Sequence, residues 1–535
     1  MSAQSSGRRA VPVARRRFLA GAVALGGLAL GCEPSSNNGN PDSSPKPEPP
    51  DPESPDSESP FTLGVASGEP RPGGVVLWTR LAREPLDGGG MPRRDLEIEW
   101  EVAEDERFAK VIARGPGIAT PLFAHSVHVA VNGLRPARWY WYRFRSGKHL
   151  SPVGRTRTAP AIGSSPDRFR FAFVSCQDYQ AGLYTAYEHL AGEDVDLVVH
   201  LGDYIYEYGV RSGNPVRRHE GAEVTDLQGY RNRHALYRSD PHLQHAHAQF
   251  PWMVTWDDHE VANDYADAAA QEPKSPDSFL KRRSAAYRAY YEHMPLRRSS
   301  LPQGPDMRIY RRAQFGDLVH ISMLDTRQYR SDQPCGGAIQ PRCAEALSES
   351  QTMTGPAQER WLLQNLDRSP ARWNIIGQQI MLAQFKAGNG AEALFNMDAW
   401  DGYAAARARL LAFMANRKPS NPVVITGDVH SSWVNDLETN FDDKTSSVVG
   451  TELVGPSISS ELPPPFELAV EAARADNPHS KFFEGSSHGY VLCDVDRRRM
   501  RSDYRVVSDV TTPGAPVSTL ASFEVADGRA GAHPG

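Results

Sequence analysis

Four strand-like segments of this sequence each end in side chains that can bind a metal ion. The first, DLVVHLGDYIYEYG at 196–209, is a buried-strand pattern that leads through Gly202 to Asp203. The other three are RFRFAFVSC at 168–176, WMVTWDDHEVAND at 252–264 and PVVITGDVHSSW at 422–433. One strand followed by Gly-Asp also describes an ordinary turn. Four such ends are a stronger signal, because buried strands rarely finish in unpaired ionisable groups and ligands bind at the carboxyl ends of strands in open α/β sheets.

The side chains at these strand ends are of two chemical kinds. The thiol of Cys176 and the phenol of Tyr206 lose their protons readily only beside a highly charged cation, which favours iron or another transition metal over magnesium. Hard oxygen ligands suit calcium or a similar cation. They are Asp258, Asn263 and Asp428. Asp203 can bridge the two ions, so the sequence predicts a site for two metals.

A two-metal site favours one reaction in particular, the hydrolysis of phosphoesters. Two ions stabilise both the attacking and the leaving oxygen of an in-line displacement, and they lower the pKa of a bound water. His259 would then polarise the phosphate or protonate the leaving group. Arg327, which follows the strand-like segment HISMLD, has a planar fork that matches phosphate oxygens. The alternative for Arg327 is a structural ion pair with Asp325.

The N-terminal 60 residues predict an export signal and a tether. In residues 1–32, Arg15–Arg17 precede Phe18 and Leu19, and an apolar run continues to Cys32. The Arg-Arg-x-Phe-Leu pattern resembles a twin-arginine signal, and a Sec signal is the alternative. The small residues before Cys32 also resemble a lipoprotein cleavage box, in which the cysteine is lipidated. Residues 33–60 are rich in Pro, Ser, Asp and Glu, which predicts a disordered linker.

The rest of the chain predicts two folded parts. Short alternating segments at 61–160, separated by turns, indicate an immunoglobulin- or fibronectin-like β-sandwich with a tyrosine corner near Tyr140. From 168 to 520, strands alternate with helices, which predicts an α/β catalytic domain. A formal net charge of -6 over 535 residues argues against a stable nucleic-acid partner.

Of the five cysteines, the remaining three also have an expected role or environment. Cys335 and Cys343, framed by Gly and Pro, could close a small disulfide loop in an exported protein. Cys493 lies within an apolar strand pattern, which indicates a buried thiol.

Six motifs in order carry a resemblance to a known family, over roughly residues 60 to 520. They are FVSCQ at 173–177, LGDYIYEYG at 201–209, WDDHEVAND at 256–264, LDTRQYR at 324–330, DAWDGY at 398–403 and GDVHSSW at 427–433. With the β-sandwich and the twin-arginine signal, the sequence resembles the PhoD-type alkaline phosphatases. These are a branch of the calcineurin-like metallophosphoesterases related to purple acid phosphatases.

The resemblance implies an αββα sandwich that holds ferric iron (Fe³⁺) and calcium (Ca²⁺). The iron ligands it implies are Cys176, Asp203, Tyr206 and His430, and the calcium ligands are Asp203, Asp258 or Asn263, and Asp428. The wider superfamily has Gly-Asn-His-Glu where this sequence has Asp257-Asp258-His259-Glu260, so either Asp258 or Asn263 takes the place of the asparagine. Asp428 stands where the superfamily usually has His.

The resulting hypothesis is an exported alkaline phosphatase that hydrolyses phosphomonoesters, and also diesters, to acquire phosphate. A phosphodiesterase or a phospholipase D-like enzyme on the same scaffold is the alternative, and a surface binding protein with a structural metal site is a third. The expected partners are a phosphoester substrate, the twin-arginine translocase during export and, through a lipidated Cys32, a membrane. The expected location is the periplasm, the cell surface or the medium.

Overall fold

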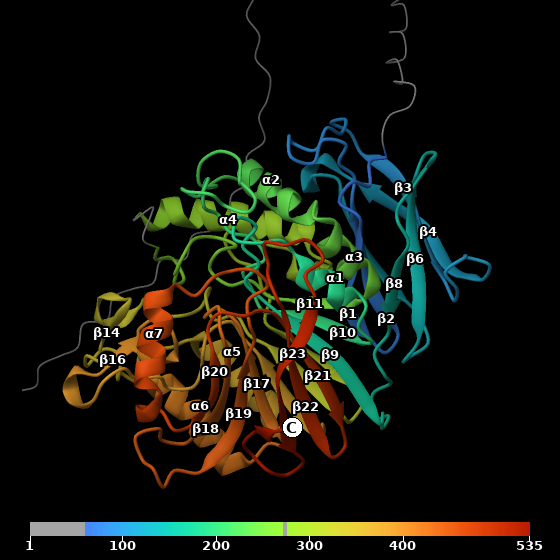
Figure 1. Cartoon of the computed structure of the whole chain (residues 1–535). Helices are drawn as coiled ribbons and strands as arrows, with labels where there is room; N and C mark the ends of the chain where they lie inside the picture. Colours follow the sequence, from blue (N-terminus) through green and yellow to red (C-terminus); the bar gives the residue numbers. More distant parts are fainter. Residues whose placement is uncertain (1–58, 271–274) are drawn as a thin grey trace, which may run out of the picture. The chain divides into compact units, whose positions relative to one another are not determined.

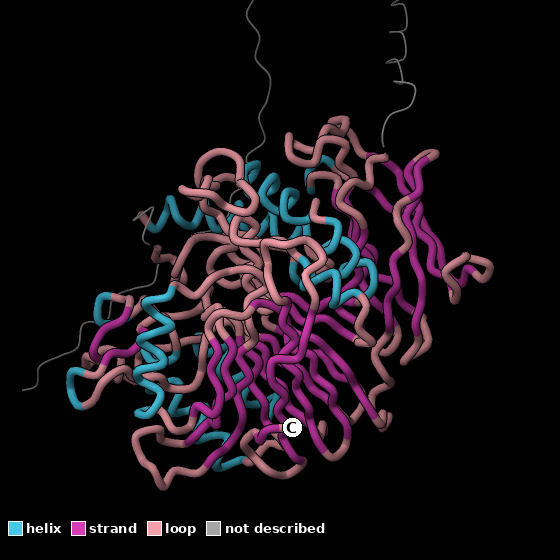
Figure 2. The backbone as a smooth tube through the Cα atoms, in the orientation of Figure 1, coloured by secondary structure: helices cyan, strands magenta, loops and turns pink. Residues whose placement is uncertain are grey.

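Two β-sheets lie face to face in the computed structural model, which describes residues 59–270 and 275–535 (Figures 1 and 2). The predicted export signal and nearly all of the predicted linker lie outside the described residues. The described residues all belong to one compact unit. Within the described ranges, no helix is long and apolar enough to cross a membrane.

The first sheet has ten strands among the described residues, in the order β24-β23-β22-β21-β9-β10-β11-β1-β2-β5. Its strands are β1 (Val65–Arg71), β2 (Gly74–Arg80), β5 (Ser126–Asn132), β9 (Arg168–Val174), β10 (Leu197–His200), β11 (Pro251–Val254), β21 (His488–Asp496), β22 (Arg499–Val507), β23 (Val517–Ala526) and β24 (His533–Pro534). At its centre, β9, β10, β11 and β1 run parallel. The parallel strands β9 and β10 are joined through α1 (Thr185–Ala191) and form a βαβ unit.

The second sheet has seven strands in the described chain, in the order β12-β13-β15-β17-β19-β18-β20. These are β12 (Arg311–Phe315), β13 (Val319–Met323), β15 (Trp373–Gly377), β17 (Pro422–Thr426), β18 (Ser432–Glu438), β19 (Val448–Val454) and β20 (Ser480–Glu484). Strands β13, β15, β17 and β19 run parallel. Both sheets thus have a parallel centre and antiparallel edges.

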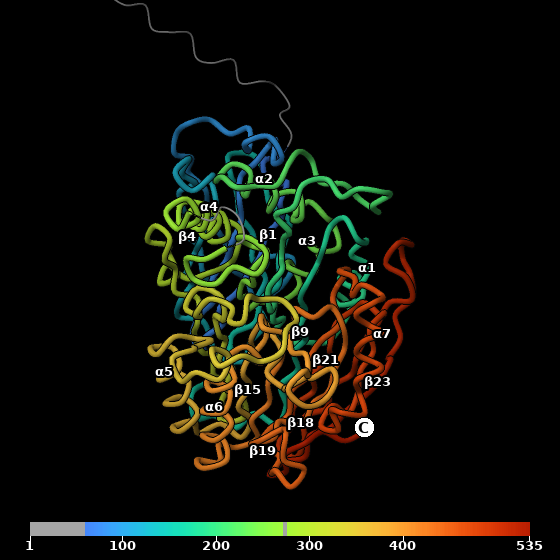
Figure 3. Tube along the Cα trace, turned by 90° about the vertical axis from the view of Figure 1, so that its left-hand side faces the viewer, coloured from blue at the N-terminus to red at the C-terminus, as the bar shows by residue number. Residues whose placement is uncertain are grey.

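Alternation along the central strands builds three apolar layers. Phe171 and Phe173 of β9 pack between the sheets with Ile375 of β15, whereas Ala172 and Val174 face the opposite side. The outer face of the first sheet is covered by α1, α2 (Leu227–Arg238), α3 (Pro241–Gln249) and α4 (Pro276–His293). The outer face of the second is covered by α5 (Gly355–Asp367) and α6 (Ala404–Arg417). Figure 3 shows α2 and α4 in the upper half of the view and α5 and α6 in the lower half. The expected αββα sandwich is confirmed.

The N-terminal β-sandwich shares one of its sheets with the larger α/β part. Its outer sheet contains β3 (Leu96–Ala103), β4 (Val111–Ala119), β6 (Trp139–Ser146), β7 (His149–Leu150) and β8 (Gly154–Arg157). Its inner sheet is β1, β2 and β5, and β1 pairs with β11 through Ser67 and Pro251. The tyrosine corner is present, because the hydroxyl of Tyr140 accepts a hydrogen bond from the Arg135 amide at 2.9 Å.

Several local features match their prediction and others differ. Cys335 and Cys343 form a disulfide, and Cys493 is a buried free thiol. The sequence NIIGQQIML at 374–382 predicts one strand, but β15 ends at Gly377, and the side chain of Gln379 beyond it donates to the Trp256 carbonyl. The sequence pattern at 398–416 predicts a helix from its start, but α6 begins only at Ala404, after a 3₁₀ turn at Trp400–Tyr403. Helix α7 (Pro464–Ala473) had no predicted counterpart.

The core between the sheets should carry much of the stability. Ile375 is 1 % exposed there, and Ile375→Ala should lower the free energy of unfolding by about 2–5 kcal/mol, because the cavity closes only in part. Urea denaturation measures this change. The control is Leu468→Ala in α7, which is 72 % exposed and should change the free energy by less than about 0.5 kcal/mol. Equal losses in the two variants would contradict this assignment of the core.

Candidate metal centre

The strand ends of both sheets meet at one edge of the sandwich. In the first sheet, Val174, His200 and Val254 are neighbours in register, so β9, β10 and β11 end level with one another. In the second sheet, Met323, Gly377 and Ile425 are neighbours in the same way. The loops that follow these six strands contain every predicted site residue. Residues far apart in the sequence are therefore brought together by strand register.

Two glycines allow the loops to approach one another. Gly202 has φ 119°, and a Cβ there would lie 2.4 Å from the Cβ of Asp257. A Cβ at Gly427 would lie 2.7 Å from the Cβ of Ser175. The Gly in each strand-Gly-Asp sequence is thus required by close packing of the neighbouring loop.

Four of the predicted ligands have a left-handed backbone. Cys176, Asp203, Asp428 and His430 have φ values of 59°, 57°, 66° and 51°. This conformation costs about 1–3 kcal/mol for a residue other than glycine, and such strain is concentrated at functional sites. The surrounding loops therefore hold these residues in conformations that they would not adopt alone.

The softer donors form one group. Ligand atoms of Cys176, Asp203 and His430 lie within 4.8 Å of one another. The Tyr206 hydroxyl donates to Asp203 Oδ2 at 2.9 Å and lies 3.1 Å from His430 Nε2. The hydroxyl of Ser460 donates to the Tyr206 oxygen at 2.7 Å. All four residues predicted to bind iron thus lie close together.

The carboxylates form an adjoining group. Ligand atoms of Asp257, Asp258 and Asp428 lie within 4.8 Å of one another, and so do those of Asp203, Asp258 and His259. Asp203 therefore lies in both parts of the site, as a bridging ligand would. The Asn263 side chain is engaged elsewhere, because its Oδ1 accepts from the Tyr208 hydroxyl at 2.9 Å. Of the two alternatives, Asp258 is the one that lies among the carboxylates.

Arg327 is fully buried among carboxylates. Its Nη1 donates to both oxygens of Asp398, at 3.1 and 2.8 Å, and its Nη2 lies 3.1 Å from Asp428 Oδ1 and 3.3 Å from Asp258 Oδ1. Its Nε donates to Asp257. Asp325 accepts from the backbone N–H of Arg327 and not from its guanidinium. Burial opposes the charge of Arg327, but the carboxylates raise its pKa well above the usual range.

The charges and unpaired atoms of this centre fit a cation. In the described chain, four buried aspartates and the partly buried Asp428 face two buried arginines; the groups are Asp203, Asp257, Asp258, Asp398 and Asp428 against Arg327 and Arg330. Burial raises the pKa of Asp428 to about 7 and that of Asp257 well above its usual value. Within the described chain, Asp203 Oδ1 and Asp257 Oδ2 are buried and accept no hydrogen bond. A cation would offset the charge and occupy these oxygens.

The thiol and phenol also fit a metal but would have to lose their protons. Burial and the nearby Asp203 raise the pKa of both Cys176 and Tyr206 well above the usual range. A metal cation reverses this effect, because it stabilises thiolate and phenolate directly. The donor set therefore suits a highly charged ion at this end of the site.

His259 is oriented by a carboxylate that the sequence analysis did not assign. Its Nδ1 lies 2.8 Å from Glu207 Oε2, which leaves Nε2 as the free nitrogen of a ring that lies within 4.8 Å of Asp203 and Asp258. Burial lowers the pKa of His259, but Glu207, Asp258 and Asp203 together raise it well above the usual value. Glu207 lies in the LGDYIYEYG motif, which could have indicated it as a partner for histidine.

Glu260 is a second residue that the sequence analysis missed. Its carboxylate accepts hydrogen bonds from the backbone N–H groups of Asp203 at 3.1 Å, Tyr204 at 2.7 Å and Asp257 at 2.8 Å. It therefore joins the loops after β10 and β11. The sequence signal for this role was the charged side chain directly after His259 in a segment with a buried pattern.

Comparison with known proteins identifies the family. A profile of the PhoD-like phosphatases matches residues 171–504, and a profile of the PhoD-like phosphatase N-terminal domain matches residues 46–160. This chain belongs to the PhoD-like phosphatase family. The expected resemblance is confirmed, and so is the expectation of an enzyme that hydrolyses phosphoric esters.

Two similar proteins cover most of the chain. Alkaline phosphatase D of Bacillus subtilis (strain 168) is 48 % identical over 515 residues, which are 95 % of this chain and 87 % of that protein. A solved structure of PhoD, also 48 % identical, superposes with a TM-score of 0.85 over 89 % of this chain and 92 % of its own. The agreement covers both the β-sandwich and the α/β part of this PhoD-like phosphatase.

The role of Glu260 as a loop tie can be tested by comparing two substitutions. Glu260→Ala leaves three backbone N–H groups without an acceptor, each costing about 1–3 kcal/mol, whereas Glu260→Gln keeps one oxygen for them. Urea denaturation should therefore show a larger loss of stability for Ala than for Gln. The exposed Glu106→Ala is the control and should change little. Equal, small effects of all three would remove Glu260 from this role.

Proposed function

We propose that this protein is an exported, metal-dependent phosphatase that hydrolyses phosphomonoesters, and also diesters, to acquire phosphate. The main support is the position of Asp203, which belongs both to the group containing Cys176 and His430 and to the group containing Asp258 and His259. An arrangement of this kind suits two adjacent ions that share one bridging carboxylate. Membership of a phosphatase family supports the same chemistry.

We assign Fe³⁺ and Ca²⁺ to the two parts of the centre. Fe³⁺ would be held by Cys176, Asp203, Tyr206 and His430, and Ca²⁺ by Asp203, Asp258 and Asp428. Thiolate and phenolate donors favour the transition metal, and carboxylates favour the harder ion. When bound, such ions supply Lewis acidity for displacement at phosphorus.

The protein's own groups then have distinct tasks. Glu207 fixes the His259 ring through Nδ1, so that Nε2 can hydrogen-bond the phosphate or donate a proton to the leaving oxygen. Arg327 holds Asp257, Asp398 and Asp428 in place and balances part of their charge. A direct contact between Arg327 and phosphate stays a prediction, because the N–H groups of its guanidinium donate to aspartates in this structure.

Export is the part of the proposal that depends on the N-terminus. The twin-arginine-like pattern of residues 1–32 supports passage through the twin-arginine translocase, and Cys32 supports a lipid anchor. The Cys335–Cys343 disulfide agrees with an oxidising compartment. The proposed location is therefore the periplasm, the cell surface or the medium.

Chelation tests the metal dependence. Purified mature protein should hydrolyse a chromogenic phosphomonoester, and a calcium chelator should abolish turnover that returns when calcium is restored. The ratio of monoester to diester rates, measured under the same conditions, separates a phosphatase from a phosphodiesterase. Chelator-resistant turnover would contradict the proposed calcium requirement. No turnover of either substrate, by protein shown to contain its metals, would favour the binding-protein alternative.

Substitution of the bridging carboxylate tests the mechanism. Asp203→Asn should lower kcat by at least about a hundredfold, because it removes the charge shared by both groups, while the circular dichroism spectrum stays unchanged. Metal analysis of the same sample should show loss of at least one ion. The matched control is Asp194→Asn, whose side chain is 86 % exposed, and which should keep full activity. Undiminished turnover of Asp203→Asn would exclude Asp203 from the mechanism.

A further inference from the structure

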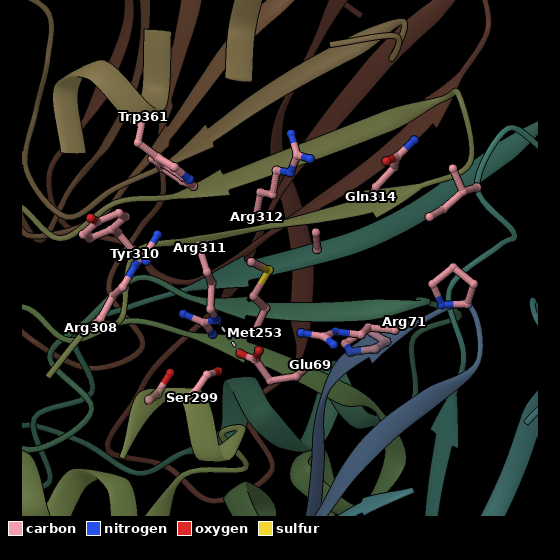
Figure 4. Close-up of a pocket in the computed structure, with 15 residues that line it drawn as sticks. Glu69, Arg71, Met253, Ser299, Arg308, Tyr310, Arg311, Arg312, Gln314 and Trp361 are labelled. Carbon is pink, nitrogen blue, oxygen red and sulfur yellow. Dashed lines mark hydrogen bonds and ion pairs between the residues drawn. The ribbon is translucent and has the colours of Figure 1, made fainter. Parts of the chain in front are cut away.

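A cavity lies on the flank of the molecule, at the side edge of the second sheet. It has a volume of about 470 Å³ and lies between the end of β1, strand β12 and the short turn Arg298–Ser300 (Figure 4). We call it the flank pocket; the residues used below are Glu69, Arg71, Met253, Arg308, Tyr310, Arg311, Arg312 and Trp361. None of its lining residues belongs to the metal-binding groups. Its volume is in the range of sites for small organic molecules.

The flank pocket is strongly basic in an acidic protein. Four arginines and one glutamate line it, while the whole chain has a formal net charge of -6. Glu69 is paired with Arg311. In residues 59–270 and 275–535, no carboxylate lies within ion-pair distance of Arg71, Arg308 or Arg312. Figure 4 shows the side chains of Arg71 and Arg311 on the Glu69 side of Met253, whereas the Arg312 guanidinium extends away from them and its Nη1 donates to Asn365 Oδ1 at 2.8 Å. Guanidinium groups on one side of a pocket suit a ligand with anionic oxygens.

One end of the flank pocket is aromatic and ordered. The Tyr310 ring packs edge-on against Trp361, with centroids 5.1 Å apart, and against Tyr329 at 5.7 Å. The Arg308 guanidinium lies 4.5 Å from the centre of the Tyr310 ring. Tyr310 and Trp361 are only half-buried, so part of each ring still faces solvent. Rings held in this way offer a surface on which a planar group can stack.

Strand β12 adds backbone groups to the same wall. It is the edge strand of the second sheet and pairs only with β13 among the described residues. Residues Arg311–Gln314 of β12 line the flank pocket. The polar backbone atoms on the side of β12 that faces away from β13 are therefore also directed to the pocket.

We propose that the flank pocket is a second ligand site, separate from the metal centre, that binds an organic phosphate of about the size of a nucleotide. The phosphate groups lie on Arg71 and Arg311, and a planar ring stacks on Trp361 and Tyr310. Inorganic phosphate shares the anionic chemistry but not the ring, so the two sources can be told apart.

Calorimetric titration of the metal-loaded protein with α,β-methylene-ADP, which resists hydrolysis between its phosphorus atoms, tests the site. The wild type should bind at two sites, and Arg71→Gln should weaken one of them roughly tenfold or more, because a charged hydrogen bond is lost. Arg114→Gln, an exposed arginine of β4, is the matched control and should retain both sites. Turnover of a small phosphomonoester should be unchanged in both variants. Unchanged binding in Arg71→Gln would overturn the proposal, and so would a parallel loss of turnover.

A second titration separates the ring from the phosphates. Methylenediphosphonate has the anionic groups without a base, so it should bind the flank pocket more weakly than α,β-methylene-ADP. Trp361→Leu should weaken the nucleotide analogue but leave methylenediphosphonate unaffected. If both probes bind the wild type equally well at this site, the pocket takes phosphate alone and the stacking part of the proposal is wrong.

Discussion

The accumulation of buried carboxylates at the edge of the sandwich is the constraint on which the rest of this structure depends. Five aspartates lie together with two arginines and little access to water. Burying an unpaired carboxylate costs several kcal/mol, so such a cluster persists only if counter-charges are supplied. Arg327 supplies one by contacting four of the aspartates. The remaining excess of negative charge is what would favour a cation in this candidate centre.

The second requirement is a frame that keeps these groups in place against their mutual repulsion. Gln379 provides one connection. Its side-chain Nε2 donates to the backbone carbonyls of Trp256 at 2.6 Å and Leu324 at 3.1 Å. Its backbone carbonyl accepts from the Gly427 N–H at 2.8 Å. It thereby joins the ends of β11, β13 and β17. Glu260 provides another within the first sheet. Polar groups that are fully hydrogen-bonded in this way hold ligand-bearing loops more rigidly than apolar packing alone would.

The sequence was informative where local pattern and chemistry coincide. The pattern of an apolar strand followed by Gly and Asp indicated the positions of Asp203 and Asp428. A buried strand needs apolar residues, and the tight turn after it needs glycine. The partners of Arg327 could not be predicted, since Asp398 is far away in sequence and approaches only when α6 and the second sheet are packed. The pairing of β1 with β11 was equally hidden, because an alternating strand pattern does not specify its neighbour. Chemistry-bearing residues were thus predictable, whereas the residues that position them depended on long-range contacts.

The same long-range contacts determine when the metal centre can exist. Its ligands extend from Cys176 to His430 and come from both sheets, and several of them have a left-handed backbone that only the folded loops enforce. An unfolded chain cannot present this set, so metal binding must follow or accompany the packing of the two sheets. The proposed metal centre would therefore best be loaded before the protein leaves the compartment where it folds. The proposed twin-arginine route, which carries folded proteins, meets that condition, whereas threading an unfolded chain through a Sec channel would require the centre to assemble afterwards.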